Sequence, residues 1–253
     1  MAGAYGIFVE NVSFESEGYK LLGRIYRPDE PGKFPAVVIC HGFPGDNKNT
    51  DLAEELAIKG YVVLIFYYRG AWGSQGVYSL KWLDPSTRDA VKYLASLPFT
   101  DAGRLGLIGY SMGAIPASAR LKANPGLKTG VFIAPAADFG LLAAEEVLET
   151  TITMLLKTCN EKLKGVDKGS IRSDLLWVLE NSNPIENIKD VARPIMVVVG
   201  TNDKTTPQIL CRLLYEAANE PKGWAIIDGA NHDFSEHRYH LMHVVLEWFS
   251  ENL

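Results

Sequence analysis

A serine flanked by glycines is the residue of this chain best placed for covalent chemistry. Ser111 is the centre of Gly109-Tyr110-Ser111-Met112-Gly113, between an apolar run at 105–108 and a small-residue segment at 114–122. A strand, this motif and a helix in succession force the serine onto a sharp turn, with its hydroxyl above a helix start that favours negative charge. We therefore predict a nucleophile at Ser111; the alternative is a serine that only caps the helix.

A serine hydroxyl needs a base and an orienting carboxylate before it can attack at neutral pH. Asp203 lies just past a predicted strand at 194–199, and His232 lies in the loop after a last predicted strand at 224–228. We predict that His232 is the base and that Asp203 orients it. Asp203 could instead cap the following helix, in which case Asp138 could be the acid, and His232 could be an ordinary surface histidine.

Attack on a carbonyl also requires two N–H groups that bind the developing oxyanion. The backbone N–H of Met112, directly after the nucleophile, is one candidate. The other should come from His41-Gly42-Phe43, which follows an apolar run at 36–40. We predict that the Phe43 N–H is this second donor and that Gly42 allows the close approach; otherwise these residues only end the strand.

The positions of these residues depend on a mainly parallel sheet with helices on both faces, because apolar strands alternate with amphipathic segments. The predicted strands are 7–14, 21–26, 36–40, 61–66, 105–108, 131–134, 194–199 and 224–228, and the predicted core helices are 51–59, 84–97, 114–122 and 234–252. The carboxyl ends of parallel strands meet at one edge, where ligands of open α/β folds bind. The predicted serine, acid and histidine all follow such ends.

One stretch breaks the alternation of strands and helices. It contains no convincing strand, but it has two apolar, helix-like segments at 141–156 and 171–179. Long loops without structure of their own are uncommon. We therefore predict a helical cap at 136–190, inserted into a core formed by 1–135 and 191–253; the alternative is a single crossover helix with a long surface loop.

The composition excludes several function classes. The chain has 253 residues, 47% hydrophobic and 22% charged, with a net charge of −5 and no basic stripe, so nucleic acid is not an expected partner. It has no apolar run long enough to span a bilayer and no signal-peptide pattern, so no membrane association is expected. Cys40, Cys159 and Cys211 are widely spaced, which is typical of buried thiols in a cytoplasmic protein. An oligomer is possible.

Three histidines on the last predicted helix hint at metal binding. His237, His240 and His243 follow at steps of three. Such steps rotate around a helix, and no carboxylate or cysteine completes a ligand set. We interpret them as a solvated face, and we expect neither a metal nor an organic cofactor.

Together, His41-Gly42-Phe43, Gly109-Tyr110-Ser111-Met112-Gly113, Gly200-Thr201-Asn202-Asp203 and Asn231-His232 resemble the α/β-hydrolase superfamily. The resemblance implies an eight-stranded α/β-hydrolase fold and the same roles for Ser111, Asp203, His232, Phe43 and Met112. Within the superfamily, the chain resembles small carboxylesterases of the cinnamoyl/feruloyl-esterase kind and the prolyl-oligopeptidase-like catalytic domain. The loop Tyr68-Arg69-Gly70-Ala71-Trp72-Gly73-Ser74 resembles an Arg-Gly-x-Gly-x-Ser loop, with Ala71-Trp72 where one residue is more usual.

The expected activity is hydrolysis of carboxylic esters through an acyl-enzyme on Ser111, with a small-molecule ester carrying an apolar or aromatic acyl group as partner. Two alternatives stay open from the sequence. One is a peptidase that acts on short acyl- or aminoacyl-peptides; the other is a catalytically silent ligand-binding protein on a hydrolase scaffold. A carboxylate nucleophile would be needed for haloalkane or epoxide hydrolysis, and Ser111 disfavours both.

Overall fold

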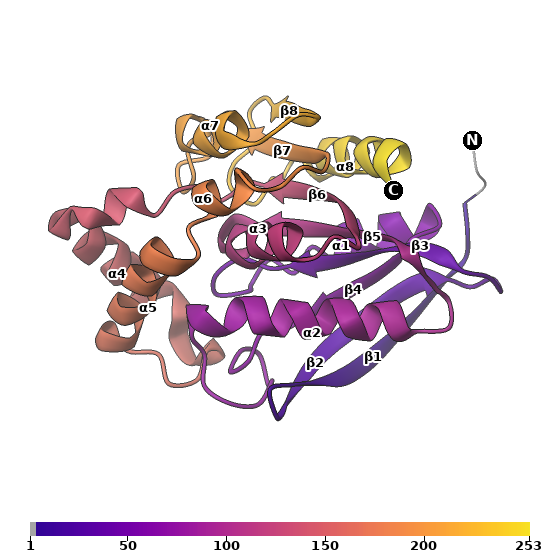
Figure 1. The fold of residues 1–253 in the computed structure, drawn as a ribbon, viewed down its shortest axis with the longest axis horizontal. Coiled ribbons are helices and arrows are strands. Elements are labelled where there is room, and N and C mark those ends of the chain that lie inside the picture. Colours follow the sequence, from indigo (N-terminus) through magenta and orange to yellow (C-terminus); the bar gives the residue numbers. More distant parts are fainter. Residues whose placement is uncertain (1–3) are drawn as a thin grey trace.

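An eight-stranded sheet runs through the centre of the molecule in the computed structural model, which describes residues 4–253 (Figure 1). The strand order is β1-β2-β4-β3-β5-β6-β7-β8. The strands are β1 (Ile7–Ser16), β2 (Tyr19–Pro28), β3 (Phe34–Cys40), β4 (Val62–Phe66), β5 (Thr100–Tyr110), β6 (Leu127–Ile133), β7 (Ile195–Gly200) and β8 (Lys222–Ile227). Only β1 with β2 and β2 with β4 pair antiparallel. The predicted mainly parallel sheet is therefore confirmed.

The parallel strands are apolar on both sides, as strands covered by helices on both faces should be. All five residues of β4 are buried, as are five of the seven in β3. The register aligns the carboxyl ends of neighbouring strands: Cys40 pairs with Gly109, and Tyr110 pairs with Ile133. Residues that directly follow these strands are therefore brought to one edge.

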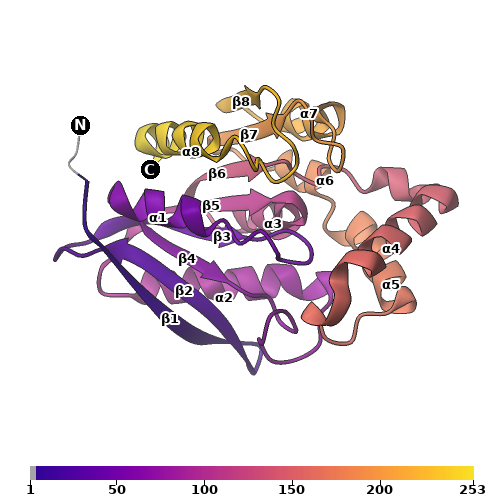
Figure 2. The same cartoon turned by 180° about the vertical axis from the view of Figure 1, so that it is seen from behind.

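Helices cover both faces of the sheet (Figures 1 and 2). On one face lie α1 (Thr50–Ile58) and α8 (Arg238–Asn252); on the other lie α2 (Leu83–Ser96), α3 (Ala114–Ala123), α6 (Pro184–Ile188) and α7 (Gln208–Ala217). Two separate hydrophobic clusters fill the layers between sheet and helices. This three-layer arrangement agrees with the α/β-hydrolase architecture that the sequence resemblance implies.

The segment between β6 and α6 lies beyond one end of the sheet (Figure 1). It contains the short turns η3 (Gly140–Ala143) and η4 (Asn160–Lys162) and the helices α4 (Glu145–Cys159) and α5 (Lys168–Asn181). Asp167 begins α5 with a capping box, in which its side chain and that of Ser170 bond each other's backbone N–H. Arg172 on α5 forms ion pairs with Glu145 and Glu149 of α4, at 2.7 and 2.8 Å.

Some predicted boundaries are wrong for identifiable reasons. The last helix begins at Arg238 and not at Phe234, because Phe234 has a φ of +55° that cannot continue a right-handed helix. The strand that precedes Ser111, β5, begins at Thr100 and not at Leu105, because Thr100 still pairs with Phe34 before a bulge. Among residues 4–253, no helix is long and apolar enough to cross a bilayer.

Candidate active site

Ser111 is the first residue of the short 3₁₀ turn η2 (Ser111–Gly113), which directly follows β5, and its backbone is strained. Its φ is +53°, a left-handed value that side chains other than glycine rarely adopt. The flanking glycines allow the chain to bend this tightly. A Cβ atom on Gly113 would lie 2.0 Å from the Cys40 carbonyl oxygen, and one on Gly109 would lie 2.8 Å from Cβ of Ala117. The sequence motif therefore has a steric explanation.

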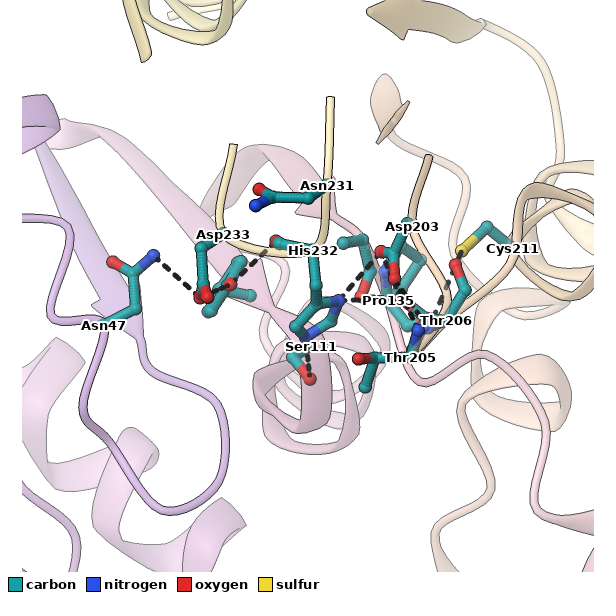
Figure 3. Close-up of polar contacts among 12 residues, drawn as sticks. Asn47, Ser111, Pro135, Asp203, Thr205, Thr206, Cys211, Asn231, His232 and Asp233 are labelled. Atoms are coloured by element: carbon teal, nitrogen blue, oxygen red, sulfur yellow. Dashed lines mark hydrogen bonds and ion pairs between the residues drawn. The ribbon is translucent and has the colours of Figure 1, made fainter. Parts of the chain in front are cut away.

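The structure brings the three predicted side chains together in one hydrogen-bonded chain (Figure 3). His232 Nε2 lies 3.1 Å from Ser111 Oγ, and His232 Nδ1 lies 2.8 Å from Asp203 Oδ2. A carboxylate only accepts, so Nδ1 carries the imidazole proton and Nε2 has a free lone pair. In this tautomer, Nε2 can accept the proton of the serine hydroxyl.

Asp203 is held in its ionised form by donors on every side. Its Oδ1 accepts the backbone N–H groups of Thr205 and Thr206, at 2.8 and 2.9 Å. Burial alone would raise the pKa of Asp203, but the bonds from His232 and Thr206 outweigh burial and lower the pKa below its ordinary value. Asp203 therefore stays negative at neutral pH and can stabilise a protonated His232.

Two further side chains support this arrangement, and no sequence motif marks either of them as part of the site. The Thr206 hydroxyl lies 2.9 Å from Asp203 Oδ2 and 3.2 Å from His232 Nδ1 (Figure 3). The Tyr110 hydroxyl is within hydrogen-bond reach of the His232 carbonyl, at 2.8 Å, and of Asp233 Oδ1, at 2.9 Å. Burial and the nearby Asp233 carboxylate raise the pKa of Tyr110, so this hydroxyl keeps its proton. Both contacts fix the loop that carries His232.

The loop after β3 approaches the serine turn closely. A Cβ atom on Gly42 would lie 2.8 Å from Ser111 Cβ. The Phe43 N–H has no hydrogen-bond acceptor within the part of the chain that the structure describes. Burial lowers the pKa of His41 to about 4, so its ring is neutral, and Nδ1 donates to the Gly42 carbonyl at 2.7 Å. The loop therefore contributes an uncommitted amide at Phe43, a residue that lines the same cavity as Ser111.

A cavity of about 550 Å³ opens above these groups. Its floor includes Ser111, His232, Phe43 and Met112, and the segment between β6 and α6 supplies the opposite wall. That wall is mostly apolar; its residues include Leu141, Leu142, Val147, Met154, Leu155 and Leu175. The cavity can hold a small molecule with an apolar group next to the serine.

Asp138, the alternative acid, lies in the cavity wall but has other partners. Its Oδ1 accepts the Gly140 N–H at 2.8 Å and the side-chain amide of Asn183 at 2.7 Å. No hydrogen bond joins it to His232 in the described part of the chain, whereas Asp203 makes one. The geometry therefore favours Asp203 as the orienting carboxylate.

Comparison with known proteins identifies the family of this chain and agrees with its fold. A family model described as the dienelactone hydrolase family matches residues 21–244. The chain belongs to the dienelactone hydrolase family. This family member is 29% identical over 225 residues to an uncharacterised protein of Mycobacterium tuberculosis, covering 87% of this chain and 70% of that protein. The resemblance to α/β-hydrolases found in the sequence is thereby confirmed, and the protein is a hydrolase by family.

Several solved structures share its fold. DcsB, in complex with its substrate analogue, superposes with a TM-score of 0.79 at 19% identity, covering 97% of this chain and all of that one (100%). Est1E from Butyrivibrio proteoclasticus, with ferulic acid bound, has a TM-score of 0.77 at 19% identity and covers 95% of this chain and 98% of that one. The esterase domain of a Rhodothermus marinus protein has a TM-score of 0.73 at 21% identity, covering 97% and 99%.

Proposed function

We propose that this protein hydrolyses carboxylic esters whose acyl group is apolar or aromatic, through an acyl-enzyme on Ser111. The observation that carries the proposal is the continuous chain from Ser111 through His232 to Asp203 at the floor of an apolar cavity. Family membership and the esterases among the structural neighbours support it, and one of those neighbours has ferulic acid bound.

The proposed reaction uses each group in turn. His232 Nε2 takes the hydroxyl proton while Ser111 Oγ attacks the ester carbonyl, and Asp203 stabilises the imidazolium. The backbone N–H groups of Phe43 and Met112 bind the tetrahedral oxyanion. His232 then protonates the departing alcohol, and a water molecule, activated by the same histidine, releases the acid. No step of this route needs a metal or cofactor.

In the same proposal, 136–190 acts as a cap over the core formed by 1–135 and 191–253. The apolar cavity wall contributed by α4 is the observation behind this role. Val147 and Met154 on α4 line the cavity and are 42% and 45% exposed, so the apolar wall continues to the surface. An acyl chain could follow that wall inward.

A cytoplasmic location is also part of the proposal. It is supported by the three cysteines, which are free and buried.

The test is a panel of p-nitrophenyl esters graded by acyl chain and extended with hydroxycinnamate esters, assayed beside aminoacyl-p-nitroanilides. We expect ester turnover, little anilide turnover and loss of both in Ser111→Ala, with its melting temperature retained. Near-normal ester turnover in Ser111→Ala would reject the assignment. Faster turnover of the anilides would indicate a peptidase, and a folded wild-type protein inert to a fluorophosphonate probe would indicate a binding protein.

A further inference from the structure

Trp72 belongs to the pair Ala71-Trp72 that stands where the Arg-Gly-x-Gly-x-Ser pattern has one residue, and it bonds both the loop after β3 and the connection between α4 and α5. Its indole Nε1 donates to the Pro44 carbonyl at 2.7 Å, and its backbone N–H donates to the Lys162 carbonyl at 3.0 Å. Its φ of +49° is left-handed, a conformation that costs a bulky residue free energy. The surrounding contacts must therefore hold it in place.

The segment after α4 is anchored to the loop that contains Trp72. Ala71 and Leu163 form an antiparallel bridge. Lys164 donates its N–H to the Gly70 carbonyl at 2.8 Å and accepts the Tyr78 N–H at 2.9 Å. The connection between α4 and α5, in the middle of the proposed cap, is therefore hydrogen-bonded to the Trp72 loop.

The loop that follows β3, at 41–45, packs against the same indole; it is called the oxyanion loop here because it contains the proposed donor Phe43. A Cβ atom on Gly45 would lie 2.7 Å from Trp72 Nε1 and 2.8 Å from His41 Cε1, so the loop fits between two rings with no spare room. Lys48 Nζ lies 3.7 Å from the centroid of a Trp72 ring, a cation–π contact. Movement of the indole would therefore be transmitted directly to this loop.

We propose that Trp72 is a positioning residue that couples the cap to the oxyanion loop. Its indole N–H fixes the Pro44 carbonyl, and this keeps the preceding Phe43 amide aimed at the substrate oxygen. Its backbone N–H holds the same residue to the Lys162 carbonyl, in the connection between α4 and α5 of the cap. This inference rests on the proposed function, because the aim of the amide matters only where an oxyanion forms.

The test compares Trp72→Phe with the matched variant Trp248→Phe. Trp248 Nε1 donates to Thr129 Oγ1 at 2.8 Å, so the control removes a similar indole hydrogen bond away from the cavity. Three quantities are measured: kcat and KM for an apolar p-nitrophenyl ester, Ki for a trifluoromethyl ketone that adds to the serine as a hemiketal oxyanion, and the melting temperature.

In Trp72→Phe we expect kcat to fall about tenfold and Ki for the ketone to rise about tenfold, while KM changes less than about twofold, because only the oxyanion contact is loosened. Trp248→Phe should keep the wild-type kcat, KM and Ki. If Trp72→Phe melts much earlier than wild type, replacement of Trp72 by 3-benzothienylalanine, which keeps the ring shape and lacks the N–H, should give the same kcat and Ki changes.

Wild-type kcat and Ki in Trp72→Phe, or a rise in KM that accounts for the whole loss, would overturn the inference. So would full activity of the benzothienyl variant. These outcomes differ from failure of the proposed function, in which wild type and Trp248→Phe would both be inert toward the ester.

Discussion

The approach of Gly42 to the nucleophile gives the sharpest quantitative prediction. In Gly42→Ala the new methyl carbon would lie 2.8 Å from Ser111 Cβ and 3.1 Å from the Tyr110 carbonyl oxygen. The first distance is about 0.6 Å short of the 3.4 Å at which ordinary van der Waals contact begins. The oxyanion loop must therefore move away from the serine turn by roughly half an ångström, and the Phe43 amide moves with it.

A misplacement of about 1 Å can cost about 10²-fold in rate, and removal of one oxyanion donor costs about 10²–10³-fold. We therefore expect kcat to fall about 10- to 100-fold in Gly42→Ala, with KM little changed and a loss of about 1–3 kcal/mol in the free energy of unfolding. The assays are steady-state ester hydrolysis and urea unfolding.

The matched control for Gly42→Ala is Gly6→Ala. A Cβ atom there would lie 3.8 Å from its nearest neighbour, Asp29 Cβ, so this variant should keep wild-type kcat and stability. Wild-type kcat in a folded Gly42→Ala protein would refute the assignment of the Phe43 amide as an oxyanion donor.

Three other predictions follow from the site. Asp203→Asn should lower kcat by about 10⁴-fold with the fold intact, because His232 loses the group that fixes its tautomer. A decrease of less than tenfold in kcat for ester hydrolysis would contradict this role. The lowered pKa of Asp203 contributes stability that is present above its ordinary pKa of 3.8 and is lost as the pH falls through the folded-state value. The urea concentration at the unfolding midpoint should therefore fall more steeply between about pH 5 and pH 3 for wild type than for Asp203→Asn. Parallel curves for the two proteins would argue against this linkage. Val147→Asp should raise KM several-fold for long-chain esters and leave acetate esters unchanged, because a charge replaces an apolar surface at the cavity mouth; equal effects on both would place the acyl chain elsewhere.

The sequence predicted the parts of the site that depend on strand ends. Ser111, Asp203 and His232 each follow an apolar run, and such runs form parallel strands whose carboxyl ends align by register. A predicted strand therefore implied a position at the edge of the sheet even where its amino-terminal boundary was wrong. The glycines around Ser111 could also be interpreted from the sequence. The structure gives the steric reason, because a side chain at Gly113 would collide with the Cys40 carbonyl oxygen.

Contacts between side chains from distant segments could not be predicted. Thr206 meets His232 across 26 positions, and the Tyr110 hydroxyl reaches the His232 carbonyl across 122. No sequence motif or regular spacing around Thr206 or Tyr110 indicates these contacts. From the sequence, Trp72 is noticeable only as part of Ala71-Trp72, the pair that departs from a loop pattern. Its partners Pro44 and Lys162 become evident only from the structure.

The most direct test of the central claim is trapping of the acyl-enzyme. Wild-type protein is mixed with an excess of an apolar p-nitrophenyl ester, quenched in acid within the first turnovers and analysed by peptide mass spectrometry. The account predicts one acyl group, on the peptide that contains Ser111, and none in Ser111→Ala. Ester turnover with the acyl group on another residue, or undiminished turnover in Ser111→Ala, would contradict it.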